Sequence, residues 1–318
     1  MLRFRGSSRM SGRSATRAVR LLLVLLLACA SAHEPPPLLP GPAPPPCTIA
    51  REPALTVAAF RARFKGRAPV VFSASASASA SASASSAAAS DAAAQLRARL
   101  SRAALLASHG GAAVTLASSN SFSHAKRAAT LREYVERHVD AGVDAARSAE
   151  ETWYLFGDTE RSAHWDSLTR GYAPPLDAAG DEGLVVFGVG GRGSGVAFHT
   201  HGAAFGETIL GAKQWFLSPP DRKPRFNGTV TQLRWALDRA AAASAAAAAT
   251  PTGASEDDVE AGDNGAVIEC VVGEGEAIYV PPRWHHATLN HAAYNVFIST
   301  FTLEKDAIVV DVALDTQP

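Results

Sequence analysis

A succession of short apolar runs fills the second half of the chain and limits the folds open to it more than any other feature. Eight runs rich in Val, Ile, Phe and Thr follow residue 180, with glycine and proline turns between them. They cover 184–189, 195–199, 207–210, 214–217, 267–272, 276–280, 287–290 and 295–303. Runs of this kind are typical of strands, and eight of them favour an antiparallel sandwich closed on itself. We therefore predict a mainly β fold, a jelly-roll or double-stranded β-helix, over residues 181–303.

Residues 47–180 carry a different pattern, in which apolar residues recur three and four positions apart. The segments 55–64 and 130–139 show this pattern most clearly. Such spacing places the apolar side chains on one face of a helix. We predict an N-terminal helical part that packs against the β core and belongs to the same domain.

Two low-complexity insertions are predicted in this domain. A Ser/Ala-rich stretch covers 73–90, and an Ala-rich, then acidic, stretch covers 240–265. Neither has a core to bury, so both are expected at the surface. The alanines of the second are expected to extend a helix that begins near Gln232, and residues 304–318 form a C-terminal tail.

The N-terminus has the layout of a secretory signal peptide. Six arginines and no acid precede an apolar run over residues 21–30, and Ala30-Ser31-Ala32 supplies a small-x-small cleavage pattern. We predict a signal peptide over 1–32 and a Pro-rich leader over 33–46. A retained N-terminal anchor is the alternative. Cleavage leaves no membrane span and predicts residence in the endoplasmic reticulum lumen or the wider secretory pathway.

Cleavage also changes the charge balance of the chain. Six arginines leave with the signal peptide, so 24 basic residues stand against 30 acidic ones in the mature chain. This mildly acidic chain has no basic patch with interleaved aromatic residues, the pattern typical of nucleic-acid binding. We expect a protein substrate or protein partner and no nucleic acid.

Cysteines and a sequon agree with an oxidising compartment. The mature chain has only Cys47 and Cys270, and an isolated pair in such a compartment favours one disulfide, with two unpaired thiols as the alternative. Asn227-Gly228-Thr229 is a glycosylation sequon on a predicted surface loop.

His199 and His201 form a candidate metal site. Side chains two apart on a strand project from the same face, so the two imidazoles can bind one ion. A third histidine from a distant strand would complete a facial set and leave other positions open for substrate or oxygen. By itself, a His-x-His pair is more often simply hydrogen-bonded than bound to metal.

The surrounding spacing strengthens the metal interpretation. It resembles the two halves of the cupin metal signature, except at Arg283, where a cupin usually has glycine. The matching positions are Gly193, His199, His201, Gly275, Pro281, His286 and Asn290.

Together with the residues that flank them, the same segments resemble a JmjC (jumonji C) domain over about residues 47–303. The residues that carry this resemblance are 198–202, 211–220 and 279–290. Within that family, the chain is similar to a member that resides in the endoplasmic reticulum lumen. This similarity rests on the signal peptide, the His-x-His pair and the sequence at 296–301.

The resemblance implies a set of site residues. His199, His201 and His286 take the three ligand positions of Fe(II), and His285 competes with His286 but fits the spacing less well. Lys213 matches the family lysine that binds the distal carboxylate of 2-oxoglutarate, with a solvent-facing lysine as the alternative. Three residues before His199 stands Val196, so no hydroxyl partner for this carboxylate is identified.

His201 departs from the family pattern, because JmjC hydroxylases bind iron through two histidines and one carboxylate. An imidazole there leaves a neutral ligand set, which changes the charge and redox behaviour of the ion. Glu207 is a tentative fourth ligand, and its alternative role is an ion pair at the rim.

Three functions stay open at this point. The chain can be an Fe(II)- and 2-oxoglutarate-dependent dioxygenase that hydroxylates a protein, or a catalytically silent JmjC scaffold that acts through protein partners. A three-histidine cupin enzyme acting on small molecules is the third, and the resemblance favours it least.

Overall fold

A computed structural model describes residues 47–75, 86–118, 125–156, 163–176, 184–249 and 267–302. All of them belong to the unit that runs from Pro37 to Pro318. The predicted signal peptide, leader and C-terminal tail lie outside the described residues, as do parts of both predicted insertions.

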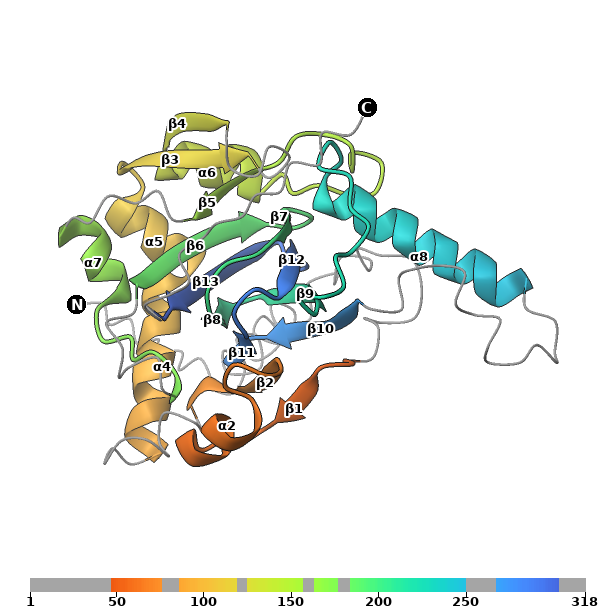
Figure 1. The fold of residues 1–318 in the computed structure, drawn as a ribbon. Helices are drawn as coiled ribbons and strands as arrows, with labels where there is room; N and C mark the ends of the chain where they lie inside the picture. The colour runs from red at the N-terminus through yellow and green to blue at the C-terminus, as the bar shows by residue number, and fades with distance from the viewer. Residues whose placement is uncertain are drawn as a thin grey trace, which may run out of the picture. The chain divides into compact units, whose positions relative to one another are not determined.

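Eight strands, four in each of two sheets, form the double-stranded β-helix (Figure 1). Strands β6, β8, β11 and β13 belong to the larger sheet, and β10, β9, β12 and β7 form the four-stranded sheet in that order. Their bounds are Leu184–Gly191 (β6), Gly195–His199 (β7), Ala204–Leu210 (β8), Ala212–Ser218 (β9), Ile268–Gly273 (β10), Glu276–Val280 (β11), His285–Asn290 (β12) and Tyr294–Phe301 (β13). Each of the eight predicted strands is present, and the mainly β fold is confirmed.

Two glycines let the chain cross from one sheet to the other within a few residues. Gly193 lies between β6 and β7 with a φ of +77°, and Gly275 lies between β10 and β11 with a φ of +78°. Glycine enters this region of backbone space without the steric cost that other residues meet. At Gly193 an added Cβ would also lie 2.2 Å from the carbonyl oxygen of Val143. These turns therefore account for both glycines of the cupin-like spacing.

The part before residue 180 is helical, as predicted, but it also contributes five strands that the sequence pattern did not reveal. Its elements are β1 (Ala50–Glu52), α2 (Val57–Arg63), β2 (Val70–Ser73), α4 (Ser86–Leu100), α5 (Arg102–His109), β3 (Ala113–Ser118), β4 (Lys126–Thr130), α6 (Leu131–Tyr134), the π-helix η1 (Val135–Val139), β5 (Trp153–Phe156) and α7 (Ala163–Thr169). The strands extend the larger sheet to the order β1-β2-β11-β8-β13-β6-β5-β3-β4. Short segments such as β4 become strands because a neighbouring strand offers backbone partners, which outweighs weak local propensity.

Helices cover the outer faces of both sheets. The larger sheet packs Val189 and Ile298 against an apolar cluster that includes Leu105 of α5 and Leu131 of α6. The four-stranded sheet packs against α8 (Gln232–Ala249), whose first turns are buried and whose alanine tract runs on past the sheets (Figure 1). A third apolar cluster lies between the two sheets and includes Trp215, Leu217 and Ile278. Polar residues fill the rest of that space, and the candidate site lies among them.

Candidate metal centre

Neighbouring strands bring the three candidate histidines together. His199 ends β7, His201 follows it, and His286 lies on β12 directly opposite His199 in the strand register. Each histidine offers one nitrogen, and these three atoms all lie within 4.8 Å of one another. His286 is buried, whereas His199 and His201 are half-buried. The cluster can therefore hold a metal ion on a side that solvent can reach.

Backbone carbonyl groups fix which nitrogen of each histidine faces the cluster. The Nδ1 atoms lie 2.8 Å from the Ala197 oxygen in His199, 2.7 Å from the Gly202 oxygen in His201 and 2.8 Å from the Trp284 oxygen in His286. A carbonyl only accepts hydrogen bonds, so each Nδ1 carries the proton and each Nε2 keeps a lone pair. This is the tautomer that a metal ion requires.

The Nε2 atoms of His201 and His286 lie 2.9 Å apart. In the tautomer set by the carbonyls neither atom has a hydrogen to donate, so two lone pairs face each other in a buried place. A cation between the rings removes that repulsion. The donor set therefore fits a divalent metal ion.

Burial keeps these imidazoles neutral. It lowers the pKa of His199 to about 4, with a further contribution from His201, and it lowers the pKa of His286 well below its ordinary value. The pKa of His201 is lowered for the same reason. Neutral imidazole is the form that binds metal, so at neutral pH the cluster does not have to lose protons first.

His285 does not compete for the site. Successive side chains on a strand point to opposite faces, and β12 keeps this alternation along its pairing with β9. His285 is half-buried, and its imidazole interacts with the backbone of Pro220 rather than with the other histidines. The structure thus places His286, and not its neighbour, in the cluster.

Lys213 lies inside the barrel rather than at the surface. Only 4% of the residue is exposed, its Nζ is 3.4 Å from Oδ1 of Asn290, and the same atom sits 3.6 Å from the centre of the Phe297 ring. Burial lowers its pKa to about 7. Among the described residues no carboxylate pairs with this amine, so an anionic ligand would supply the missing charge.

Comparison with known proteins agrees with this geometry. The profile of the family described as "JmjC domain, hydroxylase" matches residues 189–300. JmjC domain-containing protein 8 of Homo sapiens is 35% identical over 256 residues, which cover 80% of this chain and 83% of that protein. Its Mus musculus counterpart is 38% identical over 208 residues, or 65% of this chain and 70% of the relative. The chain belongs to the JmjC family.

JmjC proteins generally use Fe(II) and 2-oxoglutarate. The three histidines and Lys213 lie within residues 189–300, the part of the chain that the profile covers. None of the described helices combines the length and the apolar character needed to cross a bilayer.

Glu207 is not a fourth ligand, which corrects the tentative assignment from sequence. Along β8 it shares a face with Phe205 and Ile209, and both pack into the clusters on the outer side of the sheet. Its carboxyl group lies beside the Tyr172 hydroxyl, with Arg97 as the nearby base. Glu207 stands six residues after His201, and the alternation of side chains along β8 places it on the outer face of the sheet, away from the histidines.

Burial raises the pKa of Glu207 to about 7. Since this pKa is raised in the folded state, the stability it contributes is complete below about pH 4.5 and is lost as the pH rises toward 7. We expect Glu207→Gln to remove this fall, and to stabilise the protein at pH 8 by no more than about 3 kcal/mol. Urea unfolding at pH 5 and pH 8 measures the difference. Loss of metal binding in this variant would contradict the placement of Glu207 outside the cluster.

Arg283 occupies the position where cupins usually have glycine, and the backbone shows why. Its φ is +63°, in the left-handed region, and its amide donates to the His201 carbonyl oxygen at 2.9 Å. This arrangement ties the turn before β12 to the segment that carries His201. Arg283 therefore departs from the cupin signature and is held in a strained backbone conformation beside the cluster.

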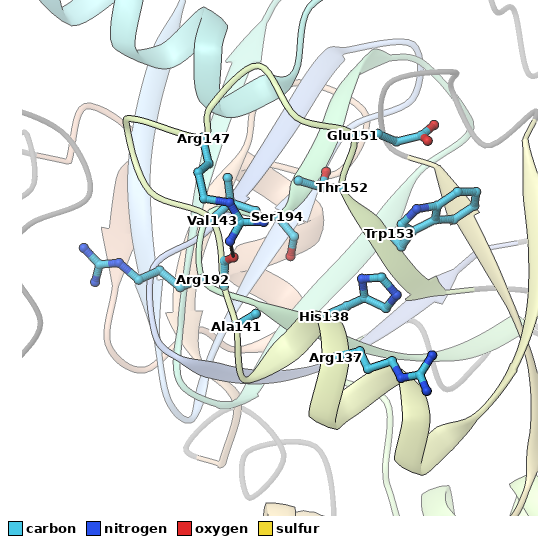
Figure 2. Close-up of a pocket in the computed structure, with 11 residues that line it drawn as sticks. Arg137, His138, Ala141, Val143, Arg147, Glu151, Thr152, Trp153, Arg192 and Ser194 are labelled. Carbon is cyan, nitrogen blue, oxygen red and sulfur yellow. Dashed lines mark hydrogen bonds between the residues drawn. The ribbon is translucent and has the colours of Figure 1, made fainter.

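A pocket lies beside the turn between β6 and β7, and its lining includes none of the three cluster histidines (Figure 2). Arg137, Arg147 and Arg192 contribute to its lining, together with Ser194. The Ser194 oxygen accepts a hydrogen bond from Nδ2 of Asn290 at 3.0 Å, and Asn290 in turn contacts Lys213. The pocket therefore reaches the Lys213 network through one side chain.

The remaining predicted residues are the two cysteines and Asn227. The Sγ atoms of Cys47 and Cys270 are 1.99 Å apart, at bonding distance, so the segment before β1 is held against β10. Asn227 is exposed between β9 and α8, and its Oδ1 accepts from the Thr229 hydroxyl at 2.7 Å. The predicted disulfide is therefore present, and glycosylation of the exposed Asn227 stays a prediction.

Sequence reasoning missed two kinds of residue at this site. The carbonyl groups of Ala197, Gly202 and Trp284 have no signal in the sequence, because any residue supplies a carbonyl. Thr288 and Trp215 also line the interior, and only the alternation along β12 and β9 could have indicated them.

Proposed function

We propose that the chain is an Fe(II)- and 2-oxoglutarate-dependent oxygenase of the JmjC type that acts on a protein in the secretory pathway. One observation carries the proposal. Three imidazoles with their Nε2 lone pairs turned to one another share the barrel interior with a buried lysine, for which the described part of the chain offers no acidic partner. A divalent ion and a dianionic cosubstrate together complement this arrangement.

The residues take distinct roles under this proposal. His199, His201 and His286 would hold the ion, and Lys213 would bind the distal carboxylate of 2-oxoglutarate. The bound iron would supply oxygen activation: 2-oxoglutarate loses CO₂ and becomes succinate with one oxygen atom of O₂, and the other atom enters a C–H bond of the substrate. The half-buried side of the cluster, at His199 and His201, is where a protein segment would approach.

A second candidate function rests on His201. Three neutral ligands leave the full charge of a divalent ion uncompensated, which disfavours the higher oxidation states that oxygen activation needs. A JmjC scaffold that holds a metal for structure and binds protein partners in the lumen is consistent with that set.

Succinate formation separates the two candidates. The purified mature protein is incubated with Fe(II), ascorbate, O₂ and 2-oxoglutarate, and succinate is quantified. The oxygenase proposal predicts succinate above the no-enzyme level that disappears in His199→Ala. A protein that binds metal and 2-oxoglutarate but forms no succinate would favour the scaffold instead.

Lys213→Met is expected to weaken 2-oxoglutarate binding by about 100-fold, because a charge-assisted hydrogen bond to a carboxylate in an enclosed site is lost. Titration calorimetry with Zn(II) in the site measures this without turnover. Lys223→Met changes an exposed lysine and serves as the matched control. Equal affinity in the wild type and Lys213→Met would show that the carboxylate binds elsewhere.

The secretory location is part of the proposal and has its own test. We expect protein made in a eukaryotic cell to run faster on a denaturing gel after glycosidase treatment, because Asn227 is exposed in a loop and can carry a glycan. Asn227→Gln should run at the position of the deglycosylated protein with or without treatment. An unshifted wild-type band with an uncleaved N-terminus would count against luminal residence.

A further inference from the structure

Two buried polar atoms inside the barrel have no hydrogen-bond partner among the residues that the structure describes. They are Oγ1 of Thr288 and Nε1 of Trp215, in residues that are 4% and 8% exposed. A buried donor left unpaired costs about 1–3 kcal/mol, so native structures rarely keep one without a reason. Two at one place indicate a ligand or ordered solvent between the sheets.

Strand register places both residues between the histidines and Lys213. Thr288 lies opposite Trp215 on paired strands, β12 and β9. His286 stands two residues before Thr288 on β12, and Asn290 stands two residues after it, opposite Lys213. Because two residues span about 7 Å along a strand, the pair sits midway between the metal cluster and the lysine.

Side-chain alternation turns these groups into the barrel. His286, Thr288 and Asn290 share one face of β12, and Lys213 and Trp215 share the same side on β9. The Trp215 ring lies 6.1 Å from the His286 ring and within reach of Gly206 on the opposite sheet, where an added Cβ would come within 2.5 Å of it. Both unpaired atoms therefore belong to the space between the three histidines and Lys213.

We infer that Thr288 and Trp215 position the ligand that runs from the metal cluster to Lys213, an inference that rests on the proposed function. The indole N–H can only donate, the hydroxyl can donate, and the lysine donates as well. An interior lined by hydrogen-bond donors and a cation complements a ligand rich in hydrogen-bond acceptors. A 2-oxo dicarboxylate is such a ligand. Thr288 also lies opposite Val196, which stands three residues before His199 and has no hydroxyl. Thr288 therefore supplies a hydroxyl at that level of the barrel.

Binding of 2-oxoglutarate to the Zn(II)-loaded protein tests the inference without turnover. Thr288→Val keeps the shape and removes the hydroxyl, and we expect affinity to fall about 10-fold or more, as for a lost hydrogen bond to a charged group. Trp215→Phe removes the N–H and should also weaken binding. Zn(II) affinity measured without 2-oxoglutarate should stay unchanged in Thr288→Val.

Thr300→Val is the matched control, because Thr300 is an equally buried threonine whose Oγ1 lies on the other face of β13, near Tyr172. Its variant should bind 2-oxoglutarate like the wild type. Wild-type affinity in Thr288→Val would overturn the inference and would assign the unpaired atoms to ordered water. A wild type that binds Zn(II) but no 2-oxoglutarate would overturn the proposed cosubstrate as well, so the two failures are distinguishable.

Discussion

His286→Ala is expected to abolish binding of a divalent ion. Within the described ranges the cluster has three protein ligands, and His286 is the one that is buried and opposite His199 in the register. Changes to residues that merely orient a ligand cost about 10–100-fold in metal affinity, so removal of a ligand itself should exceed that range. Titration with Co(II), whose d–d absorption reports the ligand set, measures the loss, and His199→Ala should behave alike.

The control for this prediction is the neighbouring histidine. His285→Ala removes an imidazole one residue away on the same strand, but that imidazole interacts with the backbone of Pro220. It should bind Co(II) with wild-type affinity and an unchanged spectrum. Equal losses in His285→Ala and His286→Ala would overturn the ligand assignment, since it depends on which face of β12 each side chain occupies.

The second large effect concerns the link between Cys47 and Cys270. Replacing both cysteines by serine is expected to lower the free energy of unfolding by about 2–5 kcal/mol, because a crosslink across a long loop restricts the unfolded chain. The two residues are 223 positions apart, so the crosslink closes a long loop. For a domain of this size the midpoint of thermal unfolding should fall by about 5–15 °C.

Packing around the link supports this expectation. Ile49, two residues after Cys47, is buried in the cluster between the sheets, and the Thr48 amide donates to the Glu269 carbonyl oxygen at 2.9 Å. A reducing agent should destabilise the wild type to the level of the double-serine variant and leave that variant unaffected. If the native protein instead reacts with a thiol reagent at both cysteines without reduction, the link does not form.

The barrel and the histidines could be predicted because each has a local signal. Strands β6 to β13 are short runs rich in Val, Ile, Phe and Thr, and Gly193 and Gly275 mark two of the turns between them. The spacing around His286 distinguishes it from His285. Lys213 could be assigned because it matches the lysine of the family that the sequence resembles, on the strand that follows the His-x-His turn. In these cases the sequence positions and the spatial positions are related by simple strand geometry.

The remaining features depend on contacts that the sequence does not encode locally. Strands β1 to β5 exist because the larger sheet offers edges to pair with, and β4 has no apolar alternation of its own. Glu207 is close to His201 in sequence, yet the direction of β8 turns it outward. The unpaired atoms of Thr288 and Trp215 become visible only once two sheets enclose them.

The central claim is that one ion and one dicarboxylate bind together inside this barrel. Anaerobic calorimetric titration of the mature protein with Fe(II), with and without 2-oxoglutarate, tests it most directly. The account predicts one ion per chain, 2-oxoglutarate binding only when the ion is present, and loss of both in His286→Ala. No bound ion, together with no heat and no stabilisation from 2-oxoglutarate, would contradict it.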